Sequence, residues 1–193
     1  GNYGVPPFSI EPNGLATFME SEKIHAEAII VSDYSYEYSH WNAVESLSEW
    51  LKREQIPGIY GIDTRALTKL LREKGSMKGK ILMKEGEDID FIDPNLINQV
   101  ARVSCKEVIT YGDGEGKKRV VLVDCGVKHN IIRSLLKRGV TVVRVPWDYD
   151  FNEMEYDGLF ISNGPGDPDT CDAAVQNIRK ALSGDKPICG ICM

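Results

Sequence analysis

The residues best suited to chemistry lie at the carboxyl end of the sequence, where Gly190-Ile191-Cys192-Met193 ends a short apolar run. We interpret residues 187–191 as a buried strand that delivers Cys192 into a sharp turn. Such a turn crowds the backbone and needs small residues, and Gly190 lies two positions before the cysteine. At the start of a following helix, a thiol meets unpaired N–H groups and the positive end of the helix dipole. Both favour the thiolate, so the pattern predicts that Cys192 is a nucleophile.

Two other interpretations of Cys192 stay open at this point. The first is a small buried hydrophobic residue, which is how most free cysteines behave. The second is a redox or metal pair, because Cys189 and Cys192 have the C-x-x-C spacing. Against the pair, Cys189 lies within the apolar strand, where we expect its side chain to be buried. A zinc site also needs two further ligands, and the sequence has no second cysteine pair and no histidine at ligand spacing.

The segment Asn163 to Pro168, NGPGDP, is the second candidate for chemistry. Its interleaved glycines and prolines predict a rigid loop whose backbone can approach a ligand without a Cβ in the way. It matches neither the dinucleotide fingerprint nor the phosphate-binding loop, so a plain turn is the alternative. Beside a thiolate, the loop would give an N–H group to the oxyanion that forms on attack at a carbonyl. The sequence has three histidines, which we interpret as structural: His25, His40 and His129.

The bulk composition narrows the class of protein. Of the 193 residues, 42% are hydrophobic and 27% charged, which is typical of a soluble globular protein. The net charge of -6 argues against a nucleic-acid surface. We find no apolar run of membrane-spanning length and no secretory signal pattern, and five scattered cysteines favour a reducing cytoplasm. The first residue is not Met and the last interrupts a motif, so we expect a chain cut at both ends.

The second half of the chain, residues 119–193, alternates strands with helices. Apolar runs predict strands at 119–124, 140–145, 158–162 and 187–191. Helical spacing predicts two helices in this half. The apolar residues of the first are Ile131, Ile132, Leu135 and Leu136. The second is capped by Asp169 or Thr170, and its apolar residues are Ala174, Val175, Ile178 and Leu182. Short connections between such elements imply an open, doubly wound parallel sheet that binds its ligand beyond the carboxyl ends of the strands.

The first half, residues 1–110, has a mixed α/β pattern, and the glycine-rich residues 111–118 form a linker by composition. We expect a strand within residues 23–32 and another at 80–83. Two helices are expected between them, one capped by Ser39 and one by Asp63 or Thr64. The second of these has Leu67, Leu70 and Leu71 inside and ends at Gly75. The fold class is therefore α/β, a mixed amino-terminal domain before a doubly wound domain at 119–193.

These motifs together resemble the small, glutamine-hydrolysing subunit or region of carbamoyl phosphate synthetase. The resemblance rests on five segments: residues 1–6 (GNYGVP), 61–68 (GIDTRALT), 75–79 (GSMKG), 124–131 (DCGVKHNI) and 162–168 (SNGPGDP), with the terminal GIC. Other class I amidotransferases share the loop and the cysteine turn but lack the motifs of the first half. Residues 1–110 thus resemble the family's amino-terminal domain, and residues 119–193 resemble the first part of its amidotransferase domain.

The resemblance implies a cysteine glutaminase in which Cys192 attacks the side-chain amide of glutamine. The N–H groups of Gly164 and Met193 would hold the oxyanion, and Gly164, Gly166 and Met193 would contact the substrate. Ammonia would pass to a large synthetase subunit or fused region, which uses ATP and Mg²⁺ to make carbamoyl phosphate for pyrimidine and arginine synthesis. The chain itself would hold no cofactor and no metal, and its first half would dock the synthetase.

The chain also departs from the family pattern. The family's catalytic His and Glu lie beyond the cysteine turn and are not among these residues. We therefore expect the 193-residue piece to have no useful glutaminase activity and to expose part of its incomplete sheet. The alternative to an enzyme component is a docking or regulatory module for the synthetase that does no chemistry.

Overall fold

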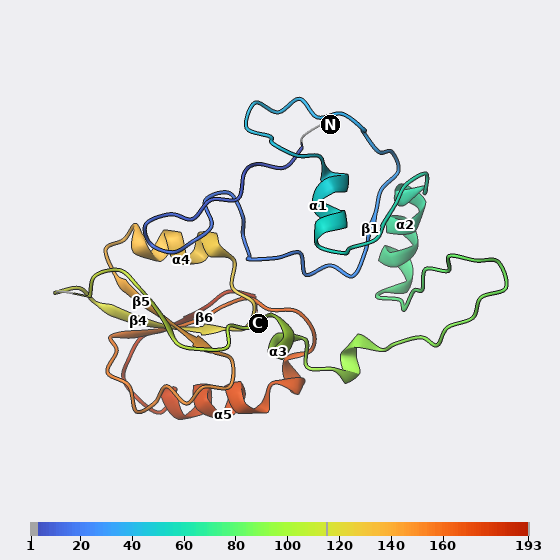
Figure 1. Cartoon of the computed structure of the whole chain (residues 1–193). Coiled ribbons are helices and arrows are strands. Elements are labelled where there is room, and N and C mark those ends of the chain that lie inside the picture. The colour runs from blue at the N-terminus through green and yellow to red at the C-terminus, as the bar shows by residue number, and fades with distance from the viewer. Residues whose placement is uncertain (1–3, 115, 193) are drawn as a thin grey trace. The chain divides into compact units, whose positions relative to one another are not determined.

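The computed structural model describes residues 4–114 and 116–192, which divide into two compact units (Figure 1). The first unit contains residues 4–9 and 22–93 of the described chain, and the second contains residues 10–21 and 94–192. The division differs from the boundary expected at residue 110. Residues 94–110 and a segment near the amino terminus both belong with the second unit, because their contacts are with its sheet and helices.

The first unit holds two helices and a short parallel strand pair, β1 (Ile29–Ile30) with β2 (Gly58–Ile59). Helix α1 (Leu47–Arg53) begins at Ser46, whose side chain forms a capping box with Glu49. Helix α2 (Thr64–Lys74) begins at the predicted cap Asp63 and ends at the predicted Gly75.

Three expectations for the first unit are wrong. Ser39 does not cap α1, because Ser46 with its Glu three residues later offers the complete capping box. Leu70 and Leu71 of α2 are exposed, since nothing in the described unit packs over that face of the helix. Residues 80–83 form no strand, because no described strand lies beside them to pair with their backbone groups.

The second unit is built on a five-stranded sheet of order β3-β5-β4-β6-β7. The strands are β3 (Ile109–Tyr111), β4 (Arg119–Asp124), β5 (Thr141–Pro146), β6 (Gly158–Ile161) and β7 (Ile188–Gly190). The last four are parallel to one another, as predicted, and β3 adds an antiparallel edge beside β5. The expected linker therefore starts one residue too early, since Tyr111 is a buried strand residue.

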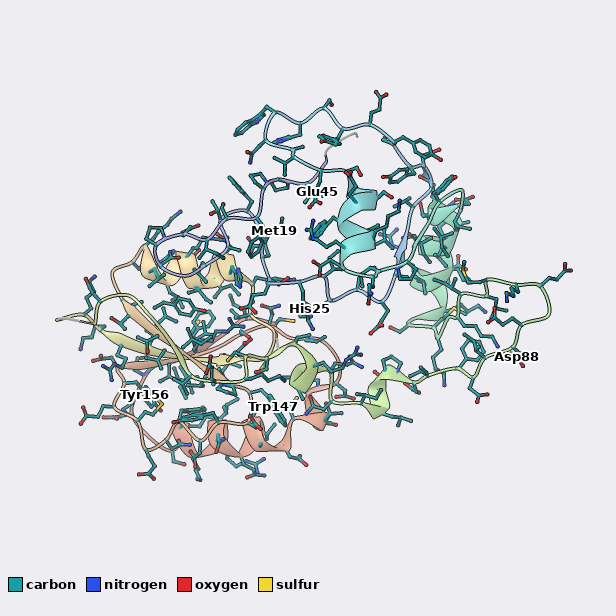
Figure 2. The ribbon with its side chains drawn as sticks, in the orientation of Figure 1. Met19, His25, Glu45, Asp88, Trp147 and Tyr156 are labelled. Carbon is teal, nitrogen blue, oxygen red and sulfur yellow. The ribbon has the colours of Figure 1, made fainter. Side chains whose placement is uncertain are left out.

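Helices cover both faces of this sheet, so the doubly wound arrangement is confirmed (Figure 1). Helix α4 (His129–Leu136) packs on one face and α5 (Asp172–Ala181) on the other. Trp147 and Tyr156 lie on the α5 side of the sheet (Figure 2) and pack against its apolar cluster. No helix in the described parts of the chain is long and apolar enough to span a membrane.

Helix α5 buries part of the predicted stripe, since Ala174 is buried and Ile178 packs against the apolar cluster on this face. Its buried residues are Ala174, Asn177 and Ala181, while Val175 and Leu182 are exposed. The stripe is displaced by about one residue because Asn177 faces the protein and donates its side-chain N–H to the carbonyl of Tyr149 at 3.0 Å. The hydrogen bond compensates the burial of the amide.

Residues 10–21, here called the strap, pack on α4. Leu15 of the strap is 1% exposed and lies in one cluster with Leu122 and Ile132. Arg133 of α4 donates to strap carbonyls at Ala16, Thr17 and Met19, the last at 3.1 Å, and Figure 2 labels Met19. The same guanidinium also pairs with two strap carboxylates, those of Glu11 and Glu20. The strap thus completes the apolar layer on this face of the sheet.

Three shorter helices complete the second unit. They are η1 (Pro94–Leu96) and α3 (Gln99–Val103) before the sheet, and η2 (Pro168–Thr170) before α5. The side chain of Asp167 caps η2, and Cys171 precedes α5, so neither Asp169 nor Thr170 is the cap predicted for that helix. Asp167 takes the capping role because the loop tightens into a 3₁₀ turn first.

Candidate active site

The chain reverses its direction of travel across the sheet between β4 and β6. From β4 the chain crosses to β5 on one side of β4, and it then returns to β6 on the other side. The carboxyl ends of β4 and β6 therefore form a topological switch point. Open α/β sheets bind their ligands in the crevice at such a point. Two segments leave the sheet there, the turn at residues 125–127 and the loop at residues 163–166.

Hydrogen bonds tie the turn directly to the loop. The N–H of Cys125 donates to the hydroxyl of Ser162 at 2.9 Å, and that hydroxyl donates to the carbonyl of Asn163 at 2.9 Å. The side-chain amide of Asn163 then donates to the carbonyl of Gly126 at 3.4 Å. The two segments therefore behave as one surface at the switch point.

Gly126 has to be a glycine at this place. Its φ is 123°, and an added Cβ would lie 2.9 Å from Val103 Cγ2 and 3.2 Å from Pro165 Cδ. Both distances are shorter than ordinary van der Waals contact, and the φ value is one that residues with side chains rarely adopt. The missing side chain allows the turn, helix α3 and the loop to pack together.

Cys192 leaves the sheet at the same edge as the loop. Strand β7 pairs in parallel with β6, with Gly190 opposite Ile161, and the N–H of Ile191 donates to the Ile161 carbonyl at 3.1 Å. Cys192 is exposed and has a φ of 77°, the left-handed region that non-glycine residues rarely occupy. A strained turn after a strand is the geometry of a nucleophile elbow. Met193 and the helix expected to follow lie outside the described residues.

Cys189 does not lie where the sequence predicts. Its side chain is exposed rather than buried, because β7 is an edge strand whose far side is not covered by any described element. Burial therefore does not count against a Cys189–Cys192 pair. All five cysteines are free thiols, and the described residues include no cluster of three or more His, Cys, Asp or Glu side chains able to hold a metal ion.

The other two predicted site residues lie on the loop. Gly164 sits against the turn, with its Cα 3.6 Å from the position of an added Gly126 Cβ. Gly166 has a φ of 82°, and an added Cβ there would lie 3.1 Å from Gln99 Cβ. The loop is therefore packed between the turn and α3, which holds its glycine backbone in place.

Helix α3 is a part of the site that the sequence analysis missed. Asn98 caps the helix and donates its side-chain N–H to the carbonyl of Thr170, at 2.9 Å, just beyond the loop. Gln99 of this helix lies against Gly166 of the loop, and Val103 lies against Gly126 of the turn. The only signal in the sequence is the Asn cap before a short apolar stretch, which is too weak to predict a helix of five residues.

A buried carboxylate, Asp124, fixes the turn. One of its oxygens accepts the N–H groups of Gly126 and Val127 at 2.9 and 2.8 Å. The other accepts the N–H of Cys105 at 2.7 Å and pairs with the guanidinium of Arg144, from Nε at 2.7 Å and Nη2 at 2.6 Å. Burial would lower the pKa of Arg144, but the charge of Asp124 and hydrogen bonds to Tyr111 and Asp124 raise it above its ordinary value. Asp124 and Arg144 therefore form a buried ion pair that hydrogen bonds from the turn and to Tyr111 extend.

Two other cysteines near the switch point are unreactive. Burial, and then the charge of Asp124, raise the pKa of Cys105 to about 12. Burial raises the pKa of Cys125 to about 12 as well, with smaller contributions from Cys171 and Asp124. Because the thiolate is the nucleophile, neither thiol competes with an exposed cysteine at neutral pH.

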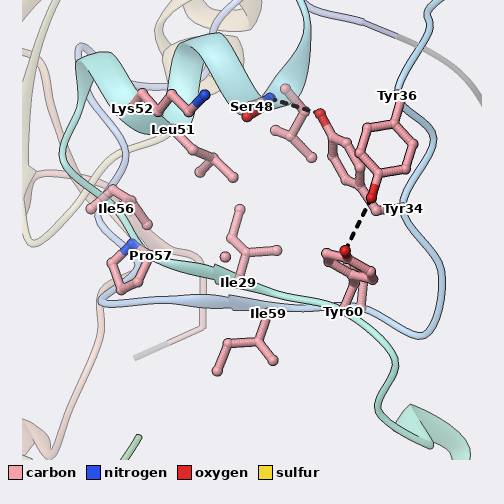
Figure 3. Close-up of a pocket in the computed structure, with 13 residues that line it drawn as sticks. Ile29, Tyr34, Tyr36, Ser48, Leu51, Lys52, Ile56, Pro57, Ile59 and Tyr60 are labelled. Atoms are coloured by element: carbon pink, nitrogen blue, oxygen red, sulfur yellow. Dashed lines mark hydrogen bonds between the residues drawn. The ribbon is translucent and has the colours of Figure 1, made fainter. Parts of the chain in front are cut away.

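A separate cavity of about 390 Å³ lies in the first unit between α1, β1 and β2 (Figure 3). Apolar side chains line most of it, including Ile29, Leu51 and Ile59. At one end the hydroxyl of Tyr36 donates to that of Tyr60 at 3.0 Å. The cavity contains none of the predicted site residues.

The comparisons with known proteins agree with this architecture. Residues 1–81 match the CPSase domain of the carbamoyl-phosphate synthase small chain, and residues 121–193 match the class-I glutamine amidotransferases. The chain is 52% identical over 212 residues to the multifunctional protein pyr1-3 of Dictyostelium discoideum, covering 100% of this chain and 10% of the relative.

Two further relatives extend the match. The chain is 52% identical over 196 residues to the mitochondrial carbamoyl-phosphate synthase [ammonia] of Aquarana catesbeiana, covering 100% of this chain and 13% of the relative. It is 46% identical over 200 residues to the carbamoyl phosphate synthase arginine-specific small chain of Phaeosphaeria nodorum, covering 100% of this chain and 42% of the relative. The chain thus spans less than half the length of each of these relatives. Since the two family models together match most of its residues, the chain belongs to the carbamoyl-phosphate synthase small-chain family, with a CPSase domain followed by class-I glutamine amidotransferase sequence.

Proposed function

We propose that this chain, within its longer protein, is the glutamine-hydrolysing component of a carbamoyl phosphate synthetase. The observation that supports the proposal most is the geometry of Cys192: an exposed cysteine with a left-handed φ, on the same sheet edge as the glycine loop. A thiolate beside backbone N–H donors is the arrangement that acyl transfer to a cysteine requires.

In the proposed reaction the Cys192 thiolate attacks the side-chain amide carbon of glutamine. The new C–S bond pushes the carbonyl electrons onto oxygen, and the N–H groups of Gly164 and Met193 stabilise that oxyanion. Gly164, Gly166 and Met193 contact the bound glutamine. The oxyanion collapses, the C–N bond breaks, and the leaving nitrogen takes a proton and departs as ammonia. Water then hydrolyses the glutamyl thioester to glutamate and restores the thiol.

The general base that moves these protons is supplied by the family's His and Glu, which the resemblance places after the cysteine turn. We therefore expect the 193-residue chain alone to show no useful glutaminase turnover. The ammonia goes to a large synthetase subunit or a fused synthetase region, and the first half of the chain docks that partner. ATP and Mg²⁺ act on the synthetase side, while this chain holds neither. We place the protein in the cytoplasm, because all five cysteines are free thiols.

A second candidate function is a docking or regulatory module without glutaminase activity. It is favoured by the match, at 52% identity, to a relative whose name specifies ammonia rather than glutamine. The presence of a cysteine at position 192 favours the glutaminase, because a module that only docks has no need of a strained nucleophile.

The test uses the complete protein that carries this chain, assayed for carbamoyl phosphate synthesis with glutamine and, separately, with ammonium. Cys192→Ser should abolish glutamine-dependent synthesis, by more than about 1,000-fold, and leave ammonium-dependent synthesis unchanged. Cys189→Ser is the matched control, since this exposed cysteine lies three positions earlier; it should retain both activities. Glutamine-dependent synthesis by Cys192→Ser would reject the nucleophile. Wild-type protein that uses ammonium alone would support the docking module instead.

A further inference from the structure

The buried pair of Asp124 and Arg144 has no part in the reaction just described, although both groups are costly to bury. Asp124 is 0% exposed and Arg144 is 6% exposed. Removing two charges from water carries a large desolvation cost. An apolar pair of similar volume often serves stability at least as well. The pair therefore needs an explanation other than the stability of the sheet.

The pair joins three segments that meet at the switch point. Asp124 ends β4 and holds the two N–H groups of the turn, at Gly126 and Val127. It also holds the N–H of Cys105, just after α3. Arg144 comes from the neighbouring strand β5, and its guanidinium fork fixes the carboxylate in one orientation. One carboxylate thus links the turn to the segment after α3, in addition to the packing of Gly126 against Val103.

The turn and α3 in turn determine where the glycine loop lies. The turn is bonded to the loop through Ser162 and Asn163, and it touches Gly164 and Pro165 across the missing side chain of Gly126. On its other side, α3 contacts the loop at Gly166. Any displacement of the turn or of α3 is therefore passed to Gly164 by direct contact.

We propose that Asp124 and Arg144 are positioning residues that set the place of the Gly164 N–H group for the oxyanion. The inference rests on the proposed glutaminase function. An oxyanion donor acts mainly in the transition state, so its displacement lowers kcat while substrate binding changes little. A shift of about 1 Å in such a group costs roughly 100-fold in rate.

The test again uses the complete protein and compares glutamine with ammonium as nitrogen source. Arg144→Met removes the fork and should lower the glutamine-dependent kcat by about 10- to 100-fold. The KM for glutamine should rise by a smaller factor than the kcat falls, since Gly164 and Gly166 also contact the substrate in the proposed function, and ammonium-dependent synthesis should match that of the wild type. Val143→Ala is the control: this buried residue precedes Arg144 on β5 and belongs to the apolar cluster on the α5 side. It loses packing without touching the pair, so its glutamine-dependent kcat should remain at the wild-type value.

If Arg144→Met does not fold, the double variant Asp124→Asn with Arg144→Gln replaces the ion pair by neutral hydrogen-bonding groups. It should show the same selective fall in kcat. A wild-type kcat in the folded variant overturns the inference. The inference is also overturned if synthesis falls equally with glutamine and with ammonium and Val143→Ala shows the same fall. That result would mean that lost stability alone explains the effect. Wild-type protein unable to use glutamine would instead reject the proposed function itself.

Discussion

At the scale of single residues, the site depends on backbone conformations that particular side chains allow or forbid. Cys192 occupies a left-handed conformation in spite of its Cβ, at a cost of about 1–3 kcal/mol. Gly126 occupies a positive φ as a glycine and uses the missing side chain for close packing. At Cys192 the conformation places backbone strain at a reactive group. At Gly126 the absent side chain leaves space that the surrounding loop and helix α3 fill.

Gly126→Ala should therefore damage the site, and a second glycine provides the control. The added methyl group meets Val103 and Pro165 at less than contact distance, so the loop has to move and glutamine-dependent synthesis should fall at least about 10-fold. Gly139 also has a positive φ, of 76°, but an added Cβ there has nothing within 4 Å. Gly139→Ala should cost about 1 kcal/mol of stability and leave the activity unchanged. Equal activities of the two variants would contradict this account of the turn.

The thiol of Cys125 should make the stability depend on alkaline pH. Its folded pKa is about 12, whereas the unfolded thiol ionises near its ordinary pKa of about 8.5. Between these values the unfolded state loses a proton that the folded state keeps, so the free energy of unfolding falls as pH rises. The expected slope from this group is up to about 1.4 kcal/mol per pH unit, and it vanishes below about pH 8.

Urea unfolding of the second unit measures this slope. The probe is the fluorescence of Trp147 in a background where Trp41 and Trp50 are replaced by Phe. Cys125→Ala should show a shallower loss of stability above about pH 9 than the parent. Slopes that do not differ would mean that the thiol is not protected from ionisation.

At the scale of elements, the strap and α4 form a unit that the sequence alone does not suggest. The strap lies more than a hundred residues before α4, and its contacts centre on Arg133. It also provides the N-terminal partners of α4: the Glu20 carbonyl accepts the His129 N–H at 3.0 Å, and the Glu20 carboxylate accepts that of Asn130 at 2.8 Å. Cutting or loosening the strap should therefore open this face of the sheet.

Arg133→Met should lower the free energy of unfolding of the second unit by about 1–3 kcal/mol, because it leaves several strap carbonyls without their donor. Arg138→Met is the control, since the guanidinium of this exposed arginine donates to the Ser134 carbonyl of its own helix, at 2.7 Å, and forms no hydrogen bond with the strap among the described residues. Its effect should stay below about 0.5 kcal/mol. The measurement is the hydrogen-exchange rate of the β4 and β5 amides, which should be faster in Arg133→Met than in Arg138→Met. Equal exchange rates would show that the strap does not hold this face.

Much of the second unit could be predicted because its elements are long and strongly patterned. The limits of β4 were predicted without error, and the apolar residues that predict α4 lie on its buried face. Strand β3 and helix α3 were missed, since each is short and is held by distant partners such as Thr170 and Asp124. The strand expected at residues 80–83 lacks a described partner, and local pattern alone cannot supply one.

The candidate site was predictable to a similar extent. The rule that parallel strands end at one edge of a sheet correctly brought Cys192 and the glycine loop to the same edge. The Asp124–Arg144 pair was missed, although a charged residue within the run TVVRVP is a sign of a buried partner. The identity of that partner depends on the order of the strands, which the sequence does not state.

At the scale of the whole molecule, the chain joins the sequences of two family models, and the strap at residues 10–21 belongs to the first model but packs in the second unit. Residues 1–81 match the CPSase domain, and residues 121–193 match the class-I amidotransferases. The proposed function needs both: the first half to dock a synthetase, and the second to release ammonia from glutamine. All of the proposed chemistry begins at one sulfur atom, that of Cys192.

The most direct test is therefore to trap the covalent intermediate. The complete protein is mixed with isotopically labelled glutamine, quenched in acid during turnover, and mapped by peptide mass spectrometry. The account predicts a labelled glutamyl thioester on the peptide that carries Cys192, and its loss in Cys192→Ser but not in Cys189→Ser. A protein that hydrolyses glutamine with no adduct at Cys192, or with the adduct on another cysteine, would contradict the central claim.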